Sequence, residues 1–346
     1  MADTLLLRAL KSQPKTVNLS YKKLDRLPRI IGKFRDIHQL QLKNNNLDSL
    51  PSEFSNLVQL ESLNLGSNKF EDLPDELKLL ISLEKLHLFN NQLVQLNAAV
   101  LSNLKNLTLL NLNHNKLKTV PREICRLTSL RHLSVENNQL EVLPPELCAL
   151  SNLEELRLAN NKLVGLPLEL GFLVSLERLY IQKNKIRELP ESISRCYRLR
   201  ILDVAANDLR IFPTEIADLP LKELFCEANP LLQHVPVHSV QEEEVLSLKE
   251  ISARFIMKEL KDRWSYLRHA IRHYPQIKEM LSQASRCAVC GDSFLNTWLE
   301  CVKFVDAKKV FKIRNSIQGT VPVRALLCSY KCFNAEGHSY YGVAFP

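Results

Sequence analysis

An asparagine recurs at an almost constant interval along most of this chain. The recurring positions, 22 to 24 residues apart, are Asn45, Asn68, Asn91, Asn115, Asn138, Asn161, Asn184, Asn207 and Asn229. Around each of them stands the frame Leu-x-x-Leu-x-Leu-x-x-Asn-x-Leu-x-x-Leu, usually followed by proline. A period this regular is typical of small structural units that stack on their neighbours, because one unit alone cannot bury its leucines.

The frame is identified as that of the leucine-rich repeat. Its Leu-x-Leu step predicts a short strand whose leucines point inward while the intervening residues face solvent. Each asparagine amide is expected to satisfy backbone groups in the turn after the strand. The proline then ends the strand side, and the chain returns through a short 3₁₀ or helical segment. We therefore predict an α/β fold, a solenoid with one parallel concave sheet and a convex side of short helical segments.

The repeat register divides the chain into four segments. We expect an N-terminal cap at 1–13, a solenoid of about ten repeats at 14–236, a helical segment at 237–285 and a small cysteine-containing β module at 286–346. Lys22 takes the place of the asparagine, so the first repeat is degenerate. Residues 3–10 are too short an apolar stretch for a signal peptide and lack a basic start.

Composition narrows the class of protein. The chain has 346 residues, of which 45% are hydrophobic, and it contains no apolar run long enough to span a membrane. Cysteines 125, 148, 196 and 226 are scattered through the repeats, which favours a reducing compartment, the cytoplasm or the nucleus. The net charge of +8 includes a basic cluster within 308–314, interpreted as a solvated face. We expect no nucleic-acid or membrane partner, and a monomer apart from its protein partners.

An amphipathic helical pattern begins after the repeats. Leu248, Ser252 and Ile256 are spaced four residues apart, which places them on one stripe of a helix. A second helix is expected through Trp264, ending before Pro275. One interpretation of the first helix is a cap that packs on the last repeat. The other is an elongin-binding segment, because the stripe resembles the BC box of SOCS-box and VHL-box proteins, with serine where cysteine is favoured.

Two close cysteine pairs follow. Cys287 and Cys290 form a Cys-x-x-Cys-Gly segment, and Cys328 and Cys332 close a second pair. Four thiolates from two such pairs suit a tetrahedral structural zinc site. The alternative is four free or buried thiols in a small β module. Strands are expected from residue 298 to 305 and from 321 to 327, so Cys301 would stand alone in a strand.

The order of these segments resembles a small family of intracellular vertebrate leucine-rich-repeat proteins over essentially the whole chain. The resemblance rests on the repeats, the Ser247-Leu248 helix and the segments 297–305 and 327–333. A wider family includes a substrate receptor of cullin ligases with the same order of parts. The resemblance implies that the tail recruits elongin B, elongin C and a cullin while the repeats hold a protein client.

The solvent-facing strand positions supply candidate client-binding residues. Aromatic and arginine side chains are the usual anchors of interfaces. The candidates are His87, Phe89, His132, Glu136, Arg157, Arg178, Tyr180, Asp203 and Phe225. The alternative is a solvated sheet face. The sequence shows no phosphate-binding glycine loop and no catalytic set, so we expect no enzyme. Two functions remain: a substrate receptor of a ubiquitin ligase, or a signalling scaffold resembling Ras-pathway repeat proteins.

Overall fold

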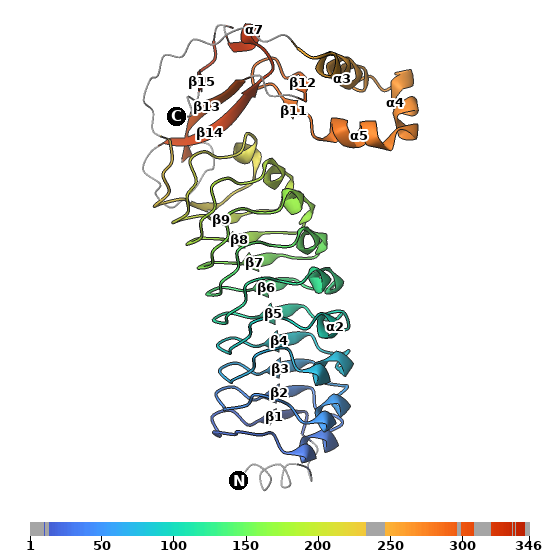
Figure 1. The fold of residues 1–346 in the computed structure, drawn as a ribbon, viewed down its shortest axis with the longest axis vertical. Helices are drawn as coiled ribbons and strands as arrows, with labels where there is room; N and C mark the ends of the chain where they lie inside the picture. The colour runs from blue at the N-terminus through green and yellow to red at the C-terminus, as the bar shows by residue number, and fades with distance from the viewer. Residues whose placement is uncertain are drawn as a thin grey trace. The chain divides into compact units, whose positions relative to one another are not determined.

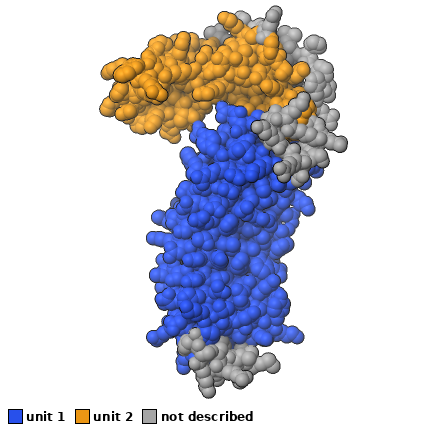
Figure 2. Space-filling view, turned by 180° about the vertical axis from the view of Figure 1, so that it is seen from behind, with its two compact units in different colours: residues 1–209, 215–230, 308–318 blue, residues 210–214, 231–307, 319–346 orange. Residues whose placement is uncertain are grey.

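The computed structural model describes residues 10, 14–232, 246–295, 299–307, 320–333, 335 and 337–342. The chain divides into two compact units (Figures 1 and 2). Unit 1 comprises 1–209, 215–230 and 308–318, and unit 2 comprises 210–214, 231–307 and 319–346. The expected N-terminal cap apart from residue 10, the array end near 236, and the basic cluster within 308–314 lie outside the described residues. No helix in the described ranges is long and apolar enough to cross a membrane.

Unit 1 contains a ten-stranded parallel sheet in which strands pair in chain order (Figure 1). Every strand has three residues, and its central residue is buried while the flanking two face solvent. The strands are β1 (Thr16–Asn18), β2 (Gln39–Gln41), β3 (Ser62–Asn64), β4 (Lys85–His87), β5 (Leu109–Asn111), β6 (His132–Ser134), β7 (Glu155–Arg157), β8 (Arg178–Tyr180), β9 (Ile201–Asp203) and β10 (Glu223–Phe225). The predicted leucine-rich-repeat solenoid is confirmed.

Short 3₁₀ helices return the chain from one strand to the next. They are η1 (Arg29–Lys33), η2 (Ser52–Asn56), η3 (Asp75–Leu79), η4 (Arg122–Arg126), η5 (Pro145–Ala149), η6 (Leu168–Phe172), η7 (Glu191–Arg195) and η8 (Ile216–Asp218). A proline precedes η1 to η7, with φ between −57° and −71°. The repeat of 24 residues differs: Asn97 replaces the proline, its Oδ1 accepts the Ala99 N–H, and an α-helix, α2 (Ala98–Leu101), results.

The recurring asparagines form a continuous hydrogen-bonded ladder through unit 1. Each Nδ2 donates to the carbonyl three residues before it and to the equivalent carbonyl of the preceding repeat, over 2.8 to 3.3 Å. Each Oδ1 accepts a backbone N–H from the preceding repeat. Most ladder carbonyls therefore accept two amides, which joins consecutive repeats.

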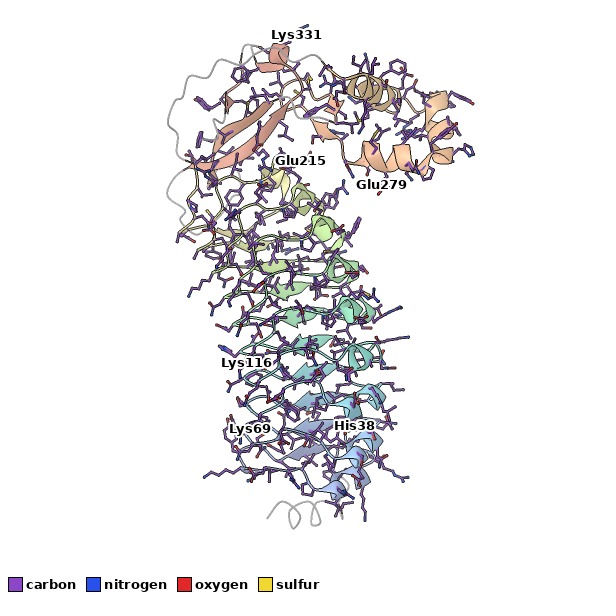
Figure 3. The ribbon with its side chains drawn as sticks, viewed as in Figure 1. His38, Lys69, Lys116, Glu215, Glu279 and Lys331 are labelled. Atoms are coloured by element: carbon purple, nitrogen blue, oxygen red, sulfur yellow. The ribbon has the colours of Figure 1, made fainter. Side chains whose placement is uncertain are left out.

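The residue before each asparagine has left-handed backbone geometry. The ten residues in this place, Tyr21 of the degenerate first repeat included, have φ between 53° and 59°, and none is glycine. Asparagine, which tolerates this region, occupies several of these positions. Ala206 and Ala228 have the same backbone geometry, although alanine does not favour it. Residues directly after two ladder asparagines, Lys69 and Lys116, project from the same edge of the array (Figure 3). The turn thus buries the amide and exposes its neighbours.

Unit 2 begins with a helical region. It contains α3 (Leu248–Glu259), α4 (Tyr266–Ala270), η9 (Ile271–His273) and α5 (Pro275–Ser282). The expected second helix starts at Tyr266, two residues after Trp264, and it does end before Pro275. The sequence interpretation missed α5, which opens with that proline at its first position. Ala253, Met257 and Leu281 form a small buried core between α3 and α5.

The β region of unit 2 surrounds the four cysteines. A hairpin of β11 (Ser285–Arg286) and β12 (Ser293–Phe294) precedes a sheet ordered β14 (Thr320–Leu327), β13 (Leu299–Asp306), β15 (Tyr341–Gly342). The helix α7 (Tyr330–Phe333) follows β14. Phe212, which also belongs to unit 2, forms a parallel bridge with Val323 of β14. The two expected strands are thus β13 and β14, which pair in antiparallel fashion.

Candidate functional site

The solvent-facing side of the ten-stranded sheet, called the sheet face, carries an ion-paired cluster at β6 to β8. Glu155 of β7 accepts from Arg157 Nε, lies 2.8 Å from Arg178 Nη2 and 3.7 Å from His132 Nδ1. The Arg157 guanidinium lies 4.7 Å from the centre of the Tyr180 ring. We call His132, Glu155, Arg157, Arg178 and Tyr180 the sheet-face cluster. It brings together four of the sequence-predicted residues around a fifth that the sequence interpretation did not select.

The charges of this cluster explain why its side chains lie together. The side chain of Glu155 is only 13% exposed, and this burial opposes ionisation, but the bond from Arg157 and the nearby cations lower its pKa overall. Two arginines surround this carboxylate, and the charges of Glu136 and Glu223 also act on the cluster, on Arg157 and Tyr180 respectively. Arg178 Nε is buried and has no hydrogen-bond partner within the described residues.

A shallow depression of about 320 Å³ adjoins the cluster. Leu109 and Asn111 of β5 line it, with His87 of β4 and with His132 and Arg157 of the cluster. Burial and the charge of Lys85 lower the pKa of His87, so this ring favours its neutral form. An apolar surface surrounded by donors suits an aliphatic or aromatic side chain of a protein partner.

Phe89 packs beside His87 and against residues of the two preceding repeats. Its ring centroid lies 6.4 Å from that of His87 in an edge-on arrangement, and Lys43 Nζ lies 5.2 Å from it. The ring occupies the space over Gly66, where a Cβ would approach it to 2.5 Å. Sequence reasoning missed Gly66 and Lys43, since neither matters until adjacent repeats are stacked.

Asp203 is in register with Tyr180 of the cluster on one side and with Phe225 of β10 on the other. Burial and the charge of Glu227 raise the pKa of Asp203, although the Ala205 N–H, which it accepts, acts in the opposite direction. Glu136 follows β6 and accepts from Asn113 Nδ2 at 3.4 Å. The nine predicted sheet-face residues therefore share one face but only four of them form a contact cluster.

The three predicted elongin-binding residues are placed differently from one another. Leu248 is 83% exposed and Ser252 is exposed, whereas Ile256 is half-buried against the core of α3 and α5. Ile251 and Phe255, both exposed, lie beside Leu248 at helical spacing. These four outward residues, Leu248, Ile251, Ser252 and Phe255, are called the α3 stripe. The buried side of α3 packs within unit 2.

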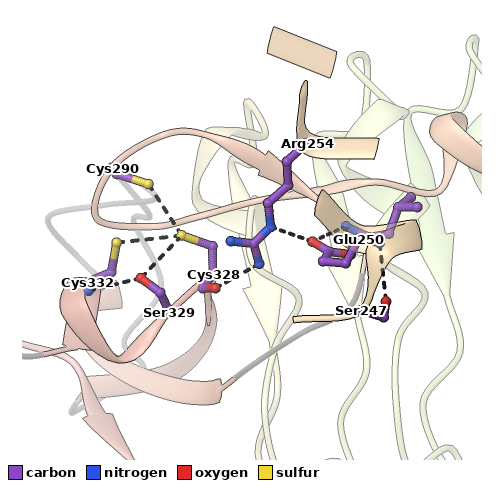
Figure 4. A network of polar contacts seen from close by, with 8 residues as sticks. Ser247, Glu250, Arg254, Cys290, Cys328, Ser329 and Cys332 are labelled. Carbon is purple, nitrogen blue, oxygen red and sulfur yellow. Dashed lines mark hydrogen bonds and ion pairs between the residues drawn. The ribbon is translucent and has the colours of Figure 1, made fainter. Parts of the chain in front are cut away.

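A buried ion pair connects α3 to the cysteines (Figure 4). Ser247 caps α3, accepting the Glu250 N–H at 3.2 Å, but the Glu250 side chain turns inward and is 1% exposed. There it accepts from Arg254 Nε at 2.6 Å and from the Leu295 N–H at 3.1 Å. Arg254 Nη2 also donates to the Cys328 carbonyl at 2.8 Å. Sequence spacing suggests a capping role for Glu250, and only the fold shows that its charge is used elsewhere.

The four predicted cysteines converge on one point. The Sγ atoms of Cys287, Cys290, Cys328 and Cys332 all lie within 4.8 Å of one another. The first pair lies in the turn of the β11–β12 hairpin, where Gly291 has φ of +75° and donates its N–H to the Cys287 carbonyl. The second pair spans one turn at the start of α7. Cys301 is fully buried in the core and is not part of this group.

The geometry fits a tetrahedral metal ion. Cys328 Sγ lies 3.6 Å from both Cys290 Sγ and Cys332 Sγ. Four sulfurs 2.3 Å from a central zinc are separated by about 3.8 Å. Burial opposes ionisation of Cys287, but N–H groups of Cys290, Cys328 and Val289 lower its pKa to about 7. Four convergent soft ligands can therefore bind a metal ion.

Comparison with known proteins shows which family the repeats match. The family model described as Leucine rich repeat matches residues 81–140 and 147–209. The structure of a leucine-rich-repeat protein from Leptospira interrogans is 30% identical with a TM-score of 0.55, and the match covers 63% of this chain and 67% of that chain. This chain belongs to the leucine-rich-repeat family.

More specific similarity covers a smaller part. Leucine-rich repeat-containing protein 69 of Xenopus laevis is 49% identical over 126 residues, which are 36% of each chain. The human protein of that name is 44% identical over 124 residues, covering 36% of this chain and 35% of the relative. The chain thus spans about a third of the length of the curated relatives it matches, less than the whole-chain resemblance expected from sequence. The repeat ectodomain of the Arabidopsis thaliana receptor kinase GASSHO1/SCHENGEN3, in complex with CASPARIAN STRIP INTEGRITY FACTOR 2, is 28% identical with a TM-score of 0.51, covering 65% and 32% of the two chains.

Proposed function

We propose that this leucine-rich-repeat protein is a two-surface adaptor that acts as substrate receptor of a cullin-RING ubiquitin ligase. The sheet face binds a protein client, and the α3 stripe docks on elongin C, which brings elongin B and a cullin. Support for a sheet-face client comes from the preformed cluster of Glu155 with two arginines and Tyr180, residue types that dominate interface energetics. The similar plant ectodomain was itself solved in complex with CASPARIAN STRIP INTEGRITY FACTOR 2.

The observation that carries the second surface is the exposure of Leu248. A leucine that is 83% exposed at the start of a helix contributes little to its own fold and is available to a partner. Ile251 and Phe255 widen the apolar surface, and the small Ser252 lets a partner backbone approach. Ile256 contributes less than the sequence pattern predicts, because it is half-buried. The anchors of this proposal are therefore Leu248 and its exposed neighbours.

A structural zinc ion is part of the proposal. Cys287, Cys290, Cys328 and Cys332 would hold it, and with four protein ligands no position is left for a reacting water. The ion would fix the Cys328 carbonyl that accepts from Arg254 and so support the buried side of α3. Metal analysis of protein purified without chelator should give one equivalent of zinc, and less than about half an equivalent would contradict this assignment.

The test of the adaptor is affinity purification with mass identification from cells. Wild type should recover elongin C, and Leu248→Asp should not, because binding would bury an unpaired carboxylate at a cost of several kcal/mol. Leu168→Asp is the matched control, since Leu168 is 77% exposed in η6 and should leave elongin recovery unchanged. Arg178→Glu should lose clients and retain elongin C. Equal recovery of elongin C by wild type and Leu248→Asp would contradict the receptor function. Recovery of clients without elongin C would favour the signalling scaffold.

A further inference from the structure

The turn between α3 and α4 holds two aromatic side chains in solvent. Asp262 Oδ1 accepts the Trp264 N–H at 2.9 Å, and the Asp262 carbonyl accepts the Ser265 N–H at 3.4 Å. Ser265 is buried, and its Oγ donates to Glu259 at 3.4 Å. These bonds fix the turn with Ser265 inward, so Trp264 and Tyr266 on either side of it face outward. The sequence interpretation placed Trp264 within the second helix, whereas it lies in the turn before α4.

The exposure of these rings is high for such large apolar surfaces. Trp264 is 93% exposed and Tyr266 is 82% exposed, and no large apolar side chain in the described part of the chain is more exposed than Trp264. Tyr274, which directly follows η9 in the sequence, is 58% exposed. Tryptophan and tyrosine strongly favour a partly apolar environment with hydrogen-bonding groups at its edge. A hydrogen-bonded turn that holds both outside therefore indicates an external partner.

The charge around the rings is predominantly positive. From residue 258 to 278 the chain has six basic residues and two acidic ones, Glu259 and Asp262. The basic residues, all exposed, are Lys258, Lys261, Arg263, Arg268, Arg272 and Lys278. They come from α3, the turn, α4, η9 and α5, on both sides of the aromatic pair in the sequence. Lys261 also lies 3.2 Å from Asp292.

We propose that residues 261–274 bind the surface of an anionic membrane. Trp264 and Tyr266 would enter the headgroup region, where these two side chains concentrate in membrane proteins. The surrounding lysines and arginines would contact acidic headgroups, whose attraction falls off within a Debye length. Binding is peripheral, as several basic residues plus a shallow aromatic insertion provide. The proposal is independent of client or elongin binding.

A lipid surface fits these observations better than a nucleic acid does. Single-stranded nucleic acids need a basic groove that follows the backbone, with aromatic platforms along it. Here the cations come from five successive elements, with the two rings in the turn and at the start of α4. A broad anionic plane does not require them to follow one groove, and the flexible basic side chains can adapt to it.

The experiment uses the full chain with vesicles of phosphatidylcholine alone or with phosphatidylserine added. The chain contains two tryptophans, so a Trp298→Phe background leaves Trp264 as the reporter. We expect sedimentation with phosphatidylserine vesicles only, a blue shift of Trp264 emission, and weaker binding at higher salt. Trp264→Ala, made in the otherwise wild-type chain, should weaken binding about tenfold, and Arg263→Glu should do so by at least that factor because a charge is reversed.

Tyr197→Ala is the matched control, because Tyr197 is 71% exposed in unit 1 and should not affect vesicle binding. All variants should retain the wild-type thermal midpoint, and if Trp264→Ala does not fold, Arg263→Glu and the emission shift decide. Absence of binding to phosphatidylserine vesicles overturns the proposal. Binding that Trp264→Ala and Arg263→Glu leave unchanged also overturns it. So does tight binding of oligouridine RNA, lost in the same two variants, in place of vesicle binding.

Discussion

Replacing Asn138 by leucine tests the asparagine ladder directly. Its Nδ2 donates to the Leu112 carbonyl at 3.0 Å and to the Val135 carbonyl at 3.3 Å, and its Oδ1 accepts the Leu117 N–H at 3.0 Å. Asn138 is 8% exposed, so water does not replace these bonds readily. Leucine has a similar volume and can make none of them.

The expected loss of stability follows from the hydrogen bonds that each backbone group keeps. The Leu117 N–H loses its side-chain acceptor, which costs about 1–3 kcal/mol for a buried donor. The two carbonyls each keep a second amide, from Asn115 and Asn161, so each loses a bond worth about 0.5–1.5 kcal/mol. Burial of the leucine methyl groups offsets about 1 kcal/mol. We expect a net loss of about 1–5 kcal/mol.

Urea unfolding followed by circular dichroism measures this loss, with Asn152→Leu as control. Asn152 is exposed and donates one bond across repeats, to the Thr128 carbonyl at 2.9 Å, so its loss should change stability by about 0.5 kcal/mol or less. Equal unfolding midpoints for the two variants would refute the argument that buried, shared carbonyls make the ladder strong. A second check is Asn138→Asp, which keeps the acceptor but loses both donors, and should be no more stable than the leucine variant at neutral pH.

Four further outcomes follow from the structure. Ala206→Gly should raise the urea midpoint by the equivalent of about 0.5–1 kcal/mol, because φ is 53° there and glycine adopts this region without strain; an unchanged or lower midpoint would count against strain at this turn. Asp203→Asn should stabilise the protein at neutral pH, since a carboxyl whose folded pKa is raised favours folding only as pH falls through that pKa; the gain should disappear below the unfolded pKa when thermal midpoints are compared across pH. Arg254→Leu should destabilise unit 2 by about 3–5 kcal/mol by removing the cation that pairs with the buried Glu250 carboxylate, and adding Glu250→Leu should recover much of that in a double-mutant cycle. Removal of metal with a chelator should lower the thermal midpoint of unit 2 and leave that of unit 1 unchanged, and a Cys332→Ser variant should already show the lower value.

The repeats were predictable because each residue in them has a local and repeated role. Leu63 and Asn68 have the same neighbours as their counterparts one repeat away, so a pattern in sequence is a pattern in space. The sheet-face cluster around Glu155 also has a sequence signal. His132, Glu155 and Arg178 hold the same frame position in consecutive repeats, which makes them neighbours across strands. That charge alternation was present but was not used.

The tail was predictable only in part, because its contacts join distant positions without a period. The spacing of the cysteines was enough to group Cys287 and Cys328, since close thiol pairs have few other structural uses. The helical spacing of residues 248–256 could not show that Ile256 is half-buried while Phe255 is exposed, because α5 was not expected. Arg254 lies one helical turn from Glu250, a local pattern, but the inward position of the Glu250 side chain also depends on the distant Leu295, a relation that no local pattern contains.

The repeat containing α2 shows where this array tolerates a change of length. Its extra residue is absorbed between Asn91 and Asn115, on the return side, and the ladder continues through it with bonds of 2.9 and 3.0 Å. Strand pairing on both sides of this repeat also stays in register. A fluorescent label attached at the exposed Ala99 or Asn103 should therefore leave the strand side intact, and the return side offers a place to attach reporters or surface tethers away from the sheet face.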